Sequence, residues 1–111
     1  MVWMYTMGNV GPIAGSWDSN GKPIPSATDV TLGGRTWNVY HQNGGTNVIS
    51  FVQTTNTASA TVDILALLNW AIAQGWIPDG TIGAAQFGFE ISGTNNVATG
   101  FICNSFSLTI N

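Results

Sequence analysis

The sequence predicts a mostly β domain, an antiparallel β-sandwich or jelly roll with one α-helix packed on its outer sheet. Short segments of alternating apolar and polar residues recur along the chain, and turns rich in Gly and Asn separate them. One segment, 61–74, instead carries apolar residues at helical spacing. No repeat or change of composition divides the 111 residues, so we expect a single domain over 1–111.

The N-terminal part is expected to hold one strand followed by loops. Residues 2–6 are almost wholly apolar, as in a central strand of a sheet. Three glycines and Pro12 within 8–15 predict an ordered loop. The turn-forming residues of 16–27 predict a surface excursion with Trp17 at its start.

The middle of the chain predicts an antiparallel meander. Its three strands are expected at 29–32, 35–40 and 47–53. Gly33-Gly34 between the first two is a strong signal for a two-residue hairpin turn. Alternation places Trp37 and Val39 on one face of the second strand, which predicts a core on that side.

The helix predicted at 61–74 has start and stop signals. Thr61 is the expected N-cap, Asp63 lies in the first turn, and Gly75 follows the end. Its expected apolar stripe, which we interpret as core packing, consists of Ile64, Leu65, Leu68, Ala71 and Ile72.

Residues 84–90 also alternate, and a last strand is expected at 101–110. Phe87 and Phe89 would anchor the first of these strands in a core, while Glu90 would lie on its open face. Glu90 is the only glutamate in the sequence. A carboxyl group held on a rigid sheet suits acid/base chemistry, and the alternative is an ordinary surface glutamate.

The charge content excludes several classes of partner. Charged residues make up 6% of the chain, against about 25% in typical domains. Two basic residues, Lys22 and Arg35, are too few to bind nucleic acid or an anionic membrane, and no apolar run is long enough to span a bilayer. Cys103 is the sole cysteine, so we expect no internal disulfide, no metal site of the Cys/His kind and no redox pair. His41 is expected at the surface.

Six short segments occur in an order typical of one enzyme family. They are Met1-Val2-Trp3, Gly11-Pro12-Ile13, Gly34-Arg35-Thr36-Trp37, Ile49-Ser50-Phe51-Val52, Gln86-Phe87-Gly88-Phe89-Glu90 and Asn104-Ser105-Phe106. In this order they resemble the C-terminal portion of glycoside hydrolase family 12, the small endo-β-1,4-glucanases with a jelly-roll fold. The resemblance runs through nearly all of the chain but covers about half of a family member. It therefore implies an incomplete, concanavalin-like jelly roll.

The resemblance implies a retaining hydrolysis of internal β-1,4-glucosidic bonds in cellulose-like glucans, with Glu90 as the general acid/base and no cofactor. Trp3 resembles a tryptophan that lines the family's cleft, and Pro12 belongs to the loop that crosses it. Gln86 lies in the segment of the acid/base, and Trp17, in an insertion, offers a further surface for stacking on sugars. The family's nucleophile is a glutamate two residues before the methionine that corresponds to Met1, so this position lies upstream of the chain.

Two other functions stay open at this point. A β-sandwich of this kind could bind β-glucan through Trp3 and Trp17 without cleaving it. Alternatively, exposed strand edges could pair with a complementary chain or with a second copy in a homo-oligomer. The residues leave cellulose, xyloglucan and mixed-linkage glucan open as ligands. We expect an extracellular, secreted location, although the chain itself carries no signal peptide.

Overall fold

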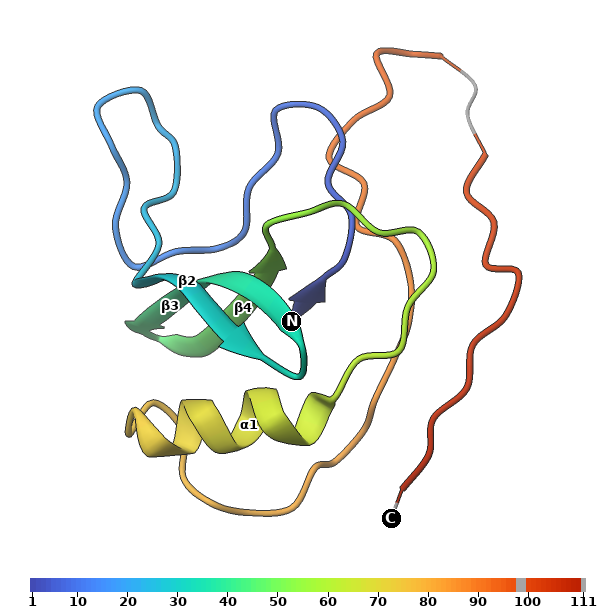
Figure 1. Cartoon of the computed structure of the whole chain (residues 1–111). Helices are drawn as coiled ribbons and strands as arrows, with labels where there is room; N and C mark the ends of the chain where they lie inside the picture. Colours follow the sequence, from blue (N-terminus) through green and yellow to red (C-terminus); the bar gives the residue numbers. More distant parts are fainter. Residues whose placement is uncertain (98–99, 111) are drawn as a thin grey trace. The chain divides into compact units, whose positions relative to one another are not determined.

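The computed structural model describes residues 1–97 and 100–110, and it divides into two units, Met1–Pro78 and Asp79–Asn111. All regular elements of the described residues lie in the first unit (Figure 1). They are β1 (Val2–Trp3), β2 (Ala27–Leu32), β3 (Arg35–Gly44), β4 (Thr46–Gln53) and α1 (Ile64–Ala73). The structure is therefore mostly β with one helix, as the sequence predicts.

The four strands form one mixed sheet in the order β1-β4-β3-β2. Strands β2, β3 and β4 pair antiparallel, which confirms the predicted meander. Gly33 and Gly34 have φ angles of 58° and 74°, and two positive φ angles at the centre of a hairpin define the turn that matches the twist of its strands.

The prediction of a central strand at 2–6 is wrong for this sheet. Strand β1 has two residues and lies at the edge of the described sheet, parallel to β4. Beyond it, the backbone N–H of Thr6 donates to Asn56 Oδ1 at 2.9 Å, and Asn56 Nδ2 donates back to the carbonyl oxygen of Thr6 at 2.8 Å. An apolar segment indicates burial, but it does not determine how many strands pair with it.

Helix α1 is shorter than predicted and begins with a different cap. Asp63 is the N-cap, and its carboxylate accepts a hydrogen bond from the N–H of Ala66 at 3.0 Å, so the prediction of Thr61 as the cap is wrong. The helix ends as predicted, because Gly75 adopts a φ of 74° and its N–H donates to the carbonyl oxygen of Ile72. Within the described residues, no helix has the length and apolarity needed to cross a membrane.

The core lies between the sheet and α1. Trp37, Val39 and Phe51 are buried on the sheet, and Leu67 and Ala71 are buried on the helix. The rings of Trp37 and Phe51 meet edge to face, with centroids 6.3 Å apart. This packing confirms that the predicted helix covers one face of the sheet.

Leu65 was expected in the apolar stripe of α1, but its side chain is 65% exposed. Leu67 occupies the centre of the contact instead and is 2% exposed. The face that meets the sheet follows the spacing i, i+3, i+4 and i+7, which starting from Ile64 selects Leu67, Leu68 and Ala71 and excludes Leu65.

The described part of the second unit contains no helix or strand, so the strands predicted at 84–90 and 101–110 are not formed. Phe87 and Phe89 are about half exposed (55% and 49%) and are not the core anchors that alternation predicted. Their rings nevertheless contact those of Phe106 and Phe101, at centroid distances of 5.5 and 5.2 Å. Alternation in the sequence indicates on which face each side chain would lie, whereas a strand also needs a neighbouring backbone for its hydrogen bonds.

Candidate functional site

The face of the sheet opposite α1 carries a set of polar and aromatic side chains. Val39 and Phe51 are paired and point toward α1, so the adjacent pair, Tyr40 and Ser50, points the other way. Trp3 pairs with Val52 and therefore lies on this same side. We call this surface the far face, and it comprises Trp3, Asn38, Tyr40, Ser50 and Val52.

The far face combines aromatic rings with hydrogen-bonding groups. Trp3 and Tyr40 are half-buried, and burial raises the pKa of Tyr40. A tyrosine phenol can donate and accept a hydrogen bond. Asn38 Oδ1 accepts from the N–H of Asp29 at 3.2 Å, which fixes the amide in place. Aromatic surface with a few fixed polar groups is the chemistry that binds sugar rings.

Ser50 differs from its neighbours on the far face. Its side chain is fully buried (0% exposed), and within the described part of the chain its Oγ has no hydrogen-bond partner. The hydroxyl is therefore closed to a ligand, and it carries the cost of an unsatisfied buried polar group.

Pro12 and Trp17 lie in the two loops between β1 and β2. Pro12 is buried, which disfavours direct contact with a ligand. Its neighbour Gly11 lies against Pro23, because a Cβ atom at Gly11 would be 2.6 Å from Pro23 Cγ. The glycine allows the two loops to pack closely together.

Trp17 is 52% exposed and stands at the base of a well-bonded loop. Its backbone pairs with that of Pro23, and Asp18 Oδ1 accepts from the N–H groups of Asn20 and Lys22 at 2.8 and 2.9 Å. The indole is thus held on an ordered support and offers a surface on which a sugar ring could stack.

Glu90 and Gln86 belong to the second unit, and both are exposed. Among the residues described there, the carboxylate of Glu90 makes no hydrogen bond or ion pair. The five predicted site residues are thus divided between the units, with Trp3, Pro12 and Trp17 in the first. The role of each remains a prediction.

Sequence reasoning did not single out Asn38 and Tyr40, although a signal was present. Polar residues alternate with Trp37 and Val39 along β3, so the strand has one apolar and one hydrogen-bonding face. Because β4 and β1 continue the same sheet, these polar residues share a surface with Trp3. These residues lie near Trp3 only because of the order of the strands in the sheet, and alternation within one strand does not specify that order.

Comparison with known proteins decides the family. The model of glycosyl hydrolase family 12 matches residues 1–111, the whole chain. The chain belongs to glycosyl hydrolase family 12. The resemblance noted in its six ordered segments is therefore confirmed.

Its relatives in this family include xyloglucan-specific enzymes. The chain is 38% identical over 73 residues to the xyloglucan-specific endo-beta-1,4-glucanase A of Emericella nidulans, a match of 65% of this chain and 28% of that protein. It is 29% identical over 112 aligned residues to a "Probable xyloglucan-specific endo-beta-1,4-glucanase A" of Aspergillus flavus, which covers 99% of this chain and 43% of that protein. The family 12 chain thus spans less than half the length of these relatives.

A solved structure supports the same placement. The xyloglucanase domain of NopAA, a type three effector from Sinorhizobium fredii in complex with cellobiose, superimposes with a TM-score of 0.61 at 39% sequence identity. The match covers 69% of this chain and 36% of that domain's chain. The mostly β architecture with one helix is therefore similar to that of this xyloglucanase domain.

Proposed function

We propose that the complete protein built around this chain hydrolyses internal β-1,4-glucosidic bonds of xyloglucan with retention of configuration, on a jelly-roll fold. The observation that supports this most directly is the family match over residues 1–111, together with relatives named as xyloglucan-specific endo-beta-1,4-glucanases. An extracellular location, where plant polysaccharide would be met, is part of the same proposal.

Glu90 is the proposed general acid/base. In the first step a second carboxylate attacks the anomeric carbon and forms a covalent glycosyl-enzyme. The glycosidic C–O bond breaks at the same time, and the carboxylic acid of Glu90 donates its proton to the oxygen of the leaving sugar. In the second step the Glu90 carboxylate accepts a proton from the water that releases the sugar. The two carboxyl groups must lie roughly 5–5.5 Å apart. We assign the nucleophile to the part of the family domain upstream of Met1.

The far face and Trp17 are proposed to hold the polymer. Trp3 and Tyr40 offer rings that can pack on the apolar faces of glucose units, and the Tyr40 phenol and the Asn38 amide can bond to hydroxyl groups. Trp17 would add stacking surface on its ordered loop. Gln86, four residues before Glu90, would contact the sugar next to the cleaved bond.

The experiment joins these 111 residues to the preceding part of the Emericella nidulans enzyme and measures reducing ends released from xyloglucan, carboxymethyl cellulose and mixed-linkage glucan. We expect the fastest release from xyloglucan. Glu90→Gln should lower kcat by at least about 100-fold, as loss of a general acid does, with little change in KM. Asp79→Asn, which also removes an exposed carboxylate from the second unit, is the matched control and should retain activity. Full activity of Glu90→Gln would refute the assignment.

A second function is glucan binding without cleavage by the 111-residue chain. The favouring observation is that Trp3 and Tyr40 share a face within the first unit, independently of Glu90. Affinity electrophoresis of the chain in gels containing xyloglucan tests it. Retarded migration that Trp3→Ala abolishes, with no reducing sugar released, would support binding as the activity of this polypeptide.

A further inference from the structure

The loop that carries Trp17 is attached at both of its ends to one edge of β3. At its first end, a Cβ atom added to Gly15 would lie 2.6 Å from the carbonyl oxygen of His41, so the two backbones are in contact. At its second end, the N–H of Ser26 donates to the carbonyl oxygen of Val39 at 2.8 Å, and Ser26 Oγ accepts from the N–H of His41 at 3.1 Å. This is the edge of β3 that also pairs with β2.

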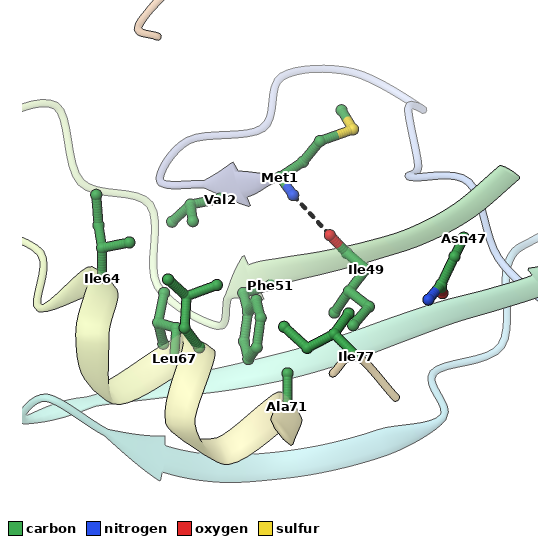
Figure 2. A pocket seen from close by; sticks show the side chains of 10 residues that line it. Met1, Val2, Asn47, Ile49, Phe51, Ile64, Leu67, Ala71 and Ile77 are labelled. Carbon is green, nitrogen blue, oxygen red and sulfur yellow. Dashed lines mark hydrogen bonds between the residues drawn. The ribbon is translucent and has the colours of Figure 1, made fainter. Parts of the chain in front are cut away.

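The loop lies on the side of the sheet that bears the far face. In Figure 1 the segment 16–25, in light blue, stands above the sheet, whereas α1 lies below it. Figure 2 shows Leu67 and Ala71 of α1 pointing toward Phe51 of β4, so the helix occupies the other face of the sheet. The loop and the far face therefore share the side that α1 leaves uncovered.

A polymer on the far face would have this loop at its side. Trp3, Val52 and Asn38 are register partners and form a row across β1, β4 and β3. The loop is attached to β3 at Val39 and His41, which are one and three residues beyond Asn38. At about 3.3 Å per residue, these attachments lie roughly 3–10 Å to one side of the row. A sugar chain laid along the row would have Trp3 beneath it and the loop beside it.

Trp17 is the aromatic residue of this loop. It follows Gly15 by two residues, so its Cα lies within about 7 Å of that attachment. Its backbone pairs with that of Pro23, and the N–H of Ile24 donates to the carbonyl oxygen of Ser16 at 3.0 Å, so the stem of the loop is hydrogen-bonded. The side chain is 52% exposed, which leaves indole surface available to a ligand.

The chemistry of the loop suits a neutral sugar. Asp18 and Lys22 are the charged residues of segment 16–25, and they carry opposite charges, so the loop has no excess charge to attract an ion. An indole ring packs well on the apolar face of a sugar ring. In xyloglucan, xylose units branch from the glucose units and project from the side of the backbone. Unbranched glucans carry no sugar there.

We propose that Trp17 is a specificity-determining residue that stacks on a xylosyl branch of xyloglucan, while the far face binds the glucan backbone. This inference rests on the proposed function, because it requires the polymer to lie on the far face. Contacts with the backbone are common to branched and unbranched glucans. The preference for the branched polymer therefore comes from the loop at its side.

Kinetics on xyloglucan and on unbranched mixed-linkage glucan test the proposal, in the protein that joins this chain to the preceding part of the Emericella nidulans enzyme. Trp17→Ala should raise the KM for xyloglucan about 10-fold through the loss of one aromatic contact, with little change in kcat. Both constants for mixed-linkage glucan should stay at the wild-type values, which also shows that the variant folds. Trp17→Phe keeps a ring and should recover part of the KM. Ile24→Ala, at a 42% exposed residue of the same stem, is the matched control and should change neither substrate.

Binding without hydrolysis separates this proposal from the proposed function. Affinity electrophoresis of the joined protein with Glu90→Gln measures its binding to each polymer, and Trp17→Ala should weaken the binding of xyloglucan alone. An inactive joined protein that shows this selective loss would refute the hydrolytic function and support the role of Trp17. Equal losses on both polymers, no loss on xyloglucan, or no binding of xyloglucan would overturn the proposal, whatever the activity.

Discussion

The imidazole of His41 stacks on the indole of Trp76, with ring centroids 4.5 Å apart and planes inclined by 22°. His41 Nε2 also lies 2.8 Å from Asn47 Oδ1, and Asn47 Nδ2 donates to the carbonyl oxygen of Trp76 at 2.8 Å. These contacts fasten the β3–β4 hairpin to the segment that leaves α1. His41 was expected at the surface, where it is half-buried, and its contacts join residues that are distant in sequence.

Truncation of His41 should destabilise the first unit. His41→Ala removes both the stack and a hydrogen bond, and we expect a loss of about 1–2 kcal/mol in the free energy of unfolding, measured by urea titration. His41→Phe keeps a ring on Trp76 and should recover part of this loss. A stability equal to the wild type for His41→Ala would show that the contact contributes nothing.

Two leucines two residues apart on α1 should respond very differently to truncation. Leu67→Ala leaves a cavity in the core and should cost about 2–5 kcal/mol. Leu65→Ala changes an exposed side chain and should stay within about 0.5 kcal/mol of the wild type. Urea titrations of both variants give the comparison, and similar losses would contradict the observed orientation of the helix.

Ser50→Ala should not destabilise the protein, although the position is fully buried. The substitution removes a hydroxyl without a hydrogen-bond partner among the described residues, at almost constant volume. We expect a gain of up to about 1 kcal/mol by urea titration. A loss above about 1 kcal/mol would reveal a partner for the hydroxyl, such as a bound water molecule.

The loop that carries Trp17 should loosen in acid. The pKa of Asp18 lies below its ordinary value of 3.8, mainly because its carboxylate accepts a hydrogen bond from the N–H of Lys22. Because the pKa of Asp18 is lower in the folded protein, the ionised carboxylate stabilises the loop at pH values above its ordinary pKa. This contribution to stability is lost as the pH falls through the pKa that Asp18 has in the folded protein. The fluorescence of Trp17 should therefore change in that acid range.

Two variants serve as controls for the acid effect. Asp18→Asn keeps an oxygen acceptor that does not titrate, so the acid change should disappear. Asp18→Ala should show the loosened state at neutral pH. An unaltered acid transition in Asp18→Asn would assign the effect to another group. Trp17→Phe, which removes the local probe, identifies the part of the signal that comes from this loop.

The sequence alone determined the features that depend on neighbours along the chain. Gly33-Gly34 specified the hairpin turn, the alternation around Trp37 and Val39 specified a buried face, and Gly75 specified the end of α1. The order of its short motifs was sufficient to predict family 12, which the comparison confirmed. Turn geometry, side-chain alternation and helix capping act over a few residues, so they can be read without the fold.

Tertiary structure decided what depends on partners far along the chain. It placed β1 at the edge of the described sheet, brought His41 onto Trp76, and gathered Phe87 with Phe106 without forming the predicted strand. A strand requires a second backbone for its hydrogen bonds, and a stack requires a second ring. Neither partner is specified by local sequence, because chain folding brings these groups together from distant positions.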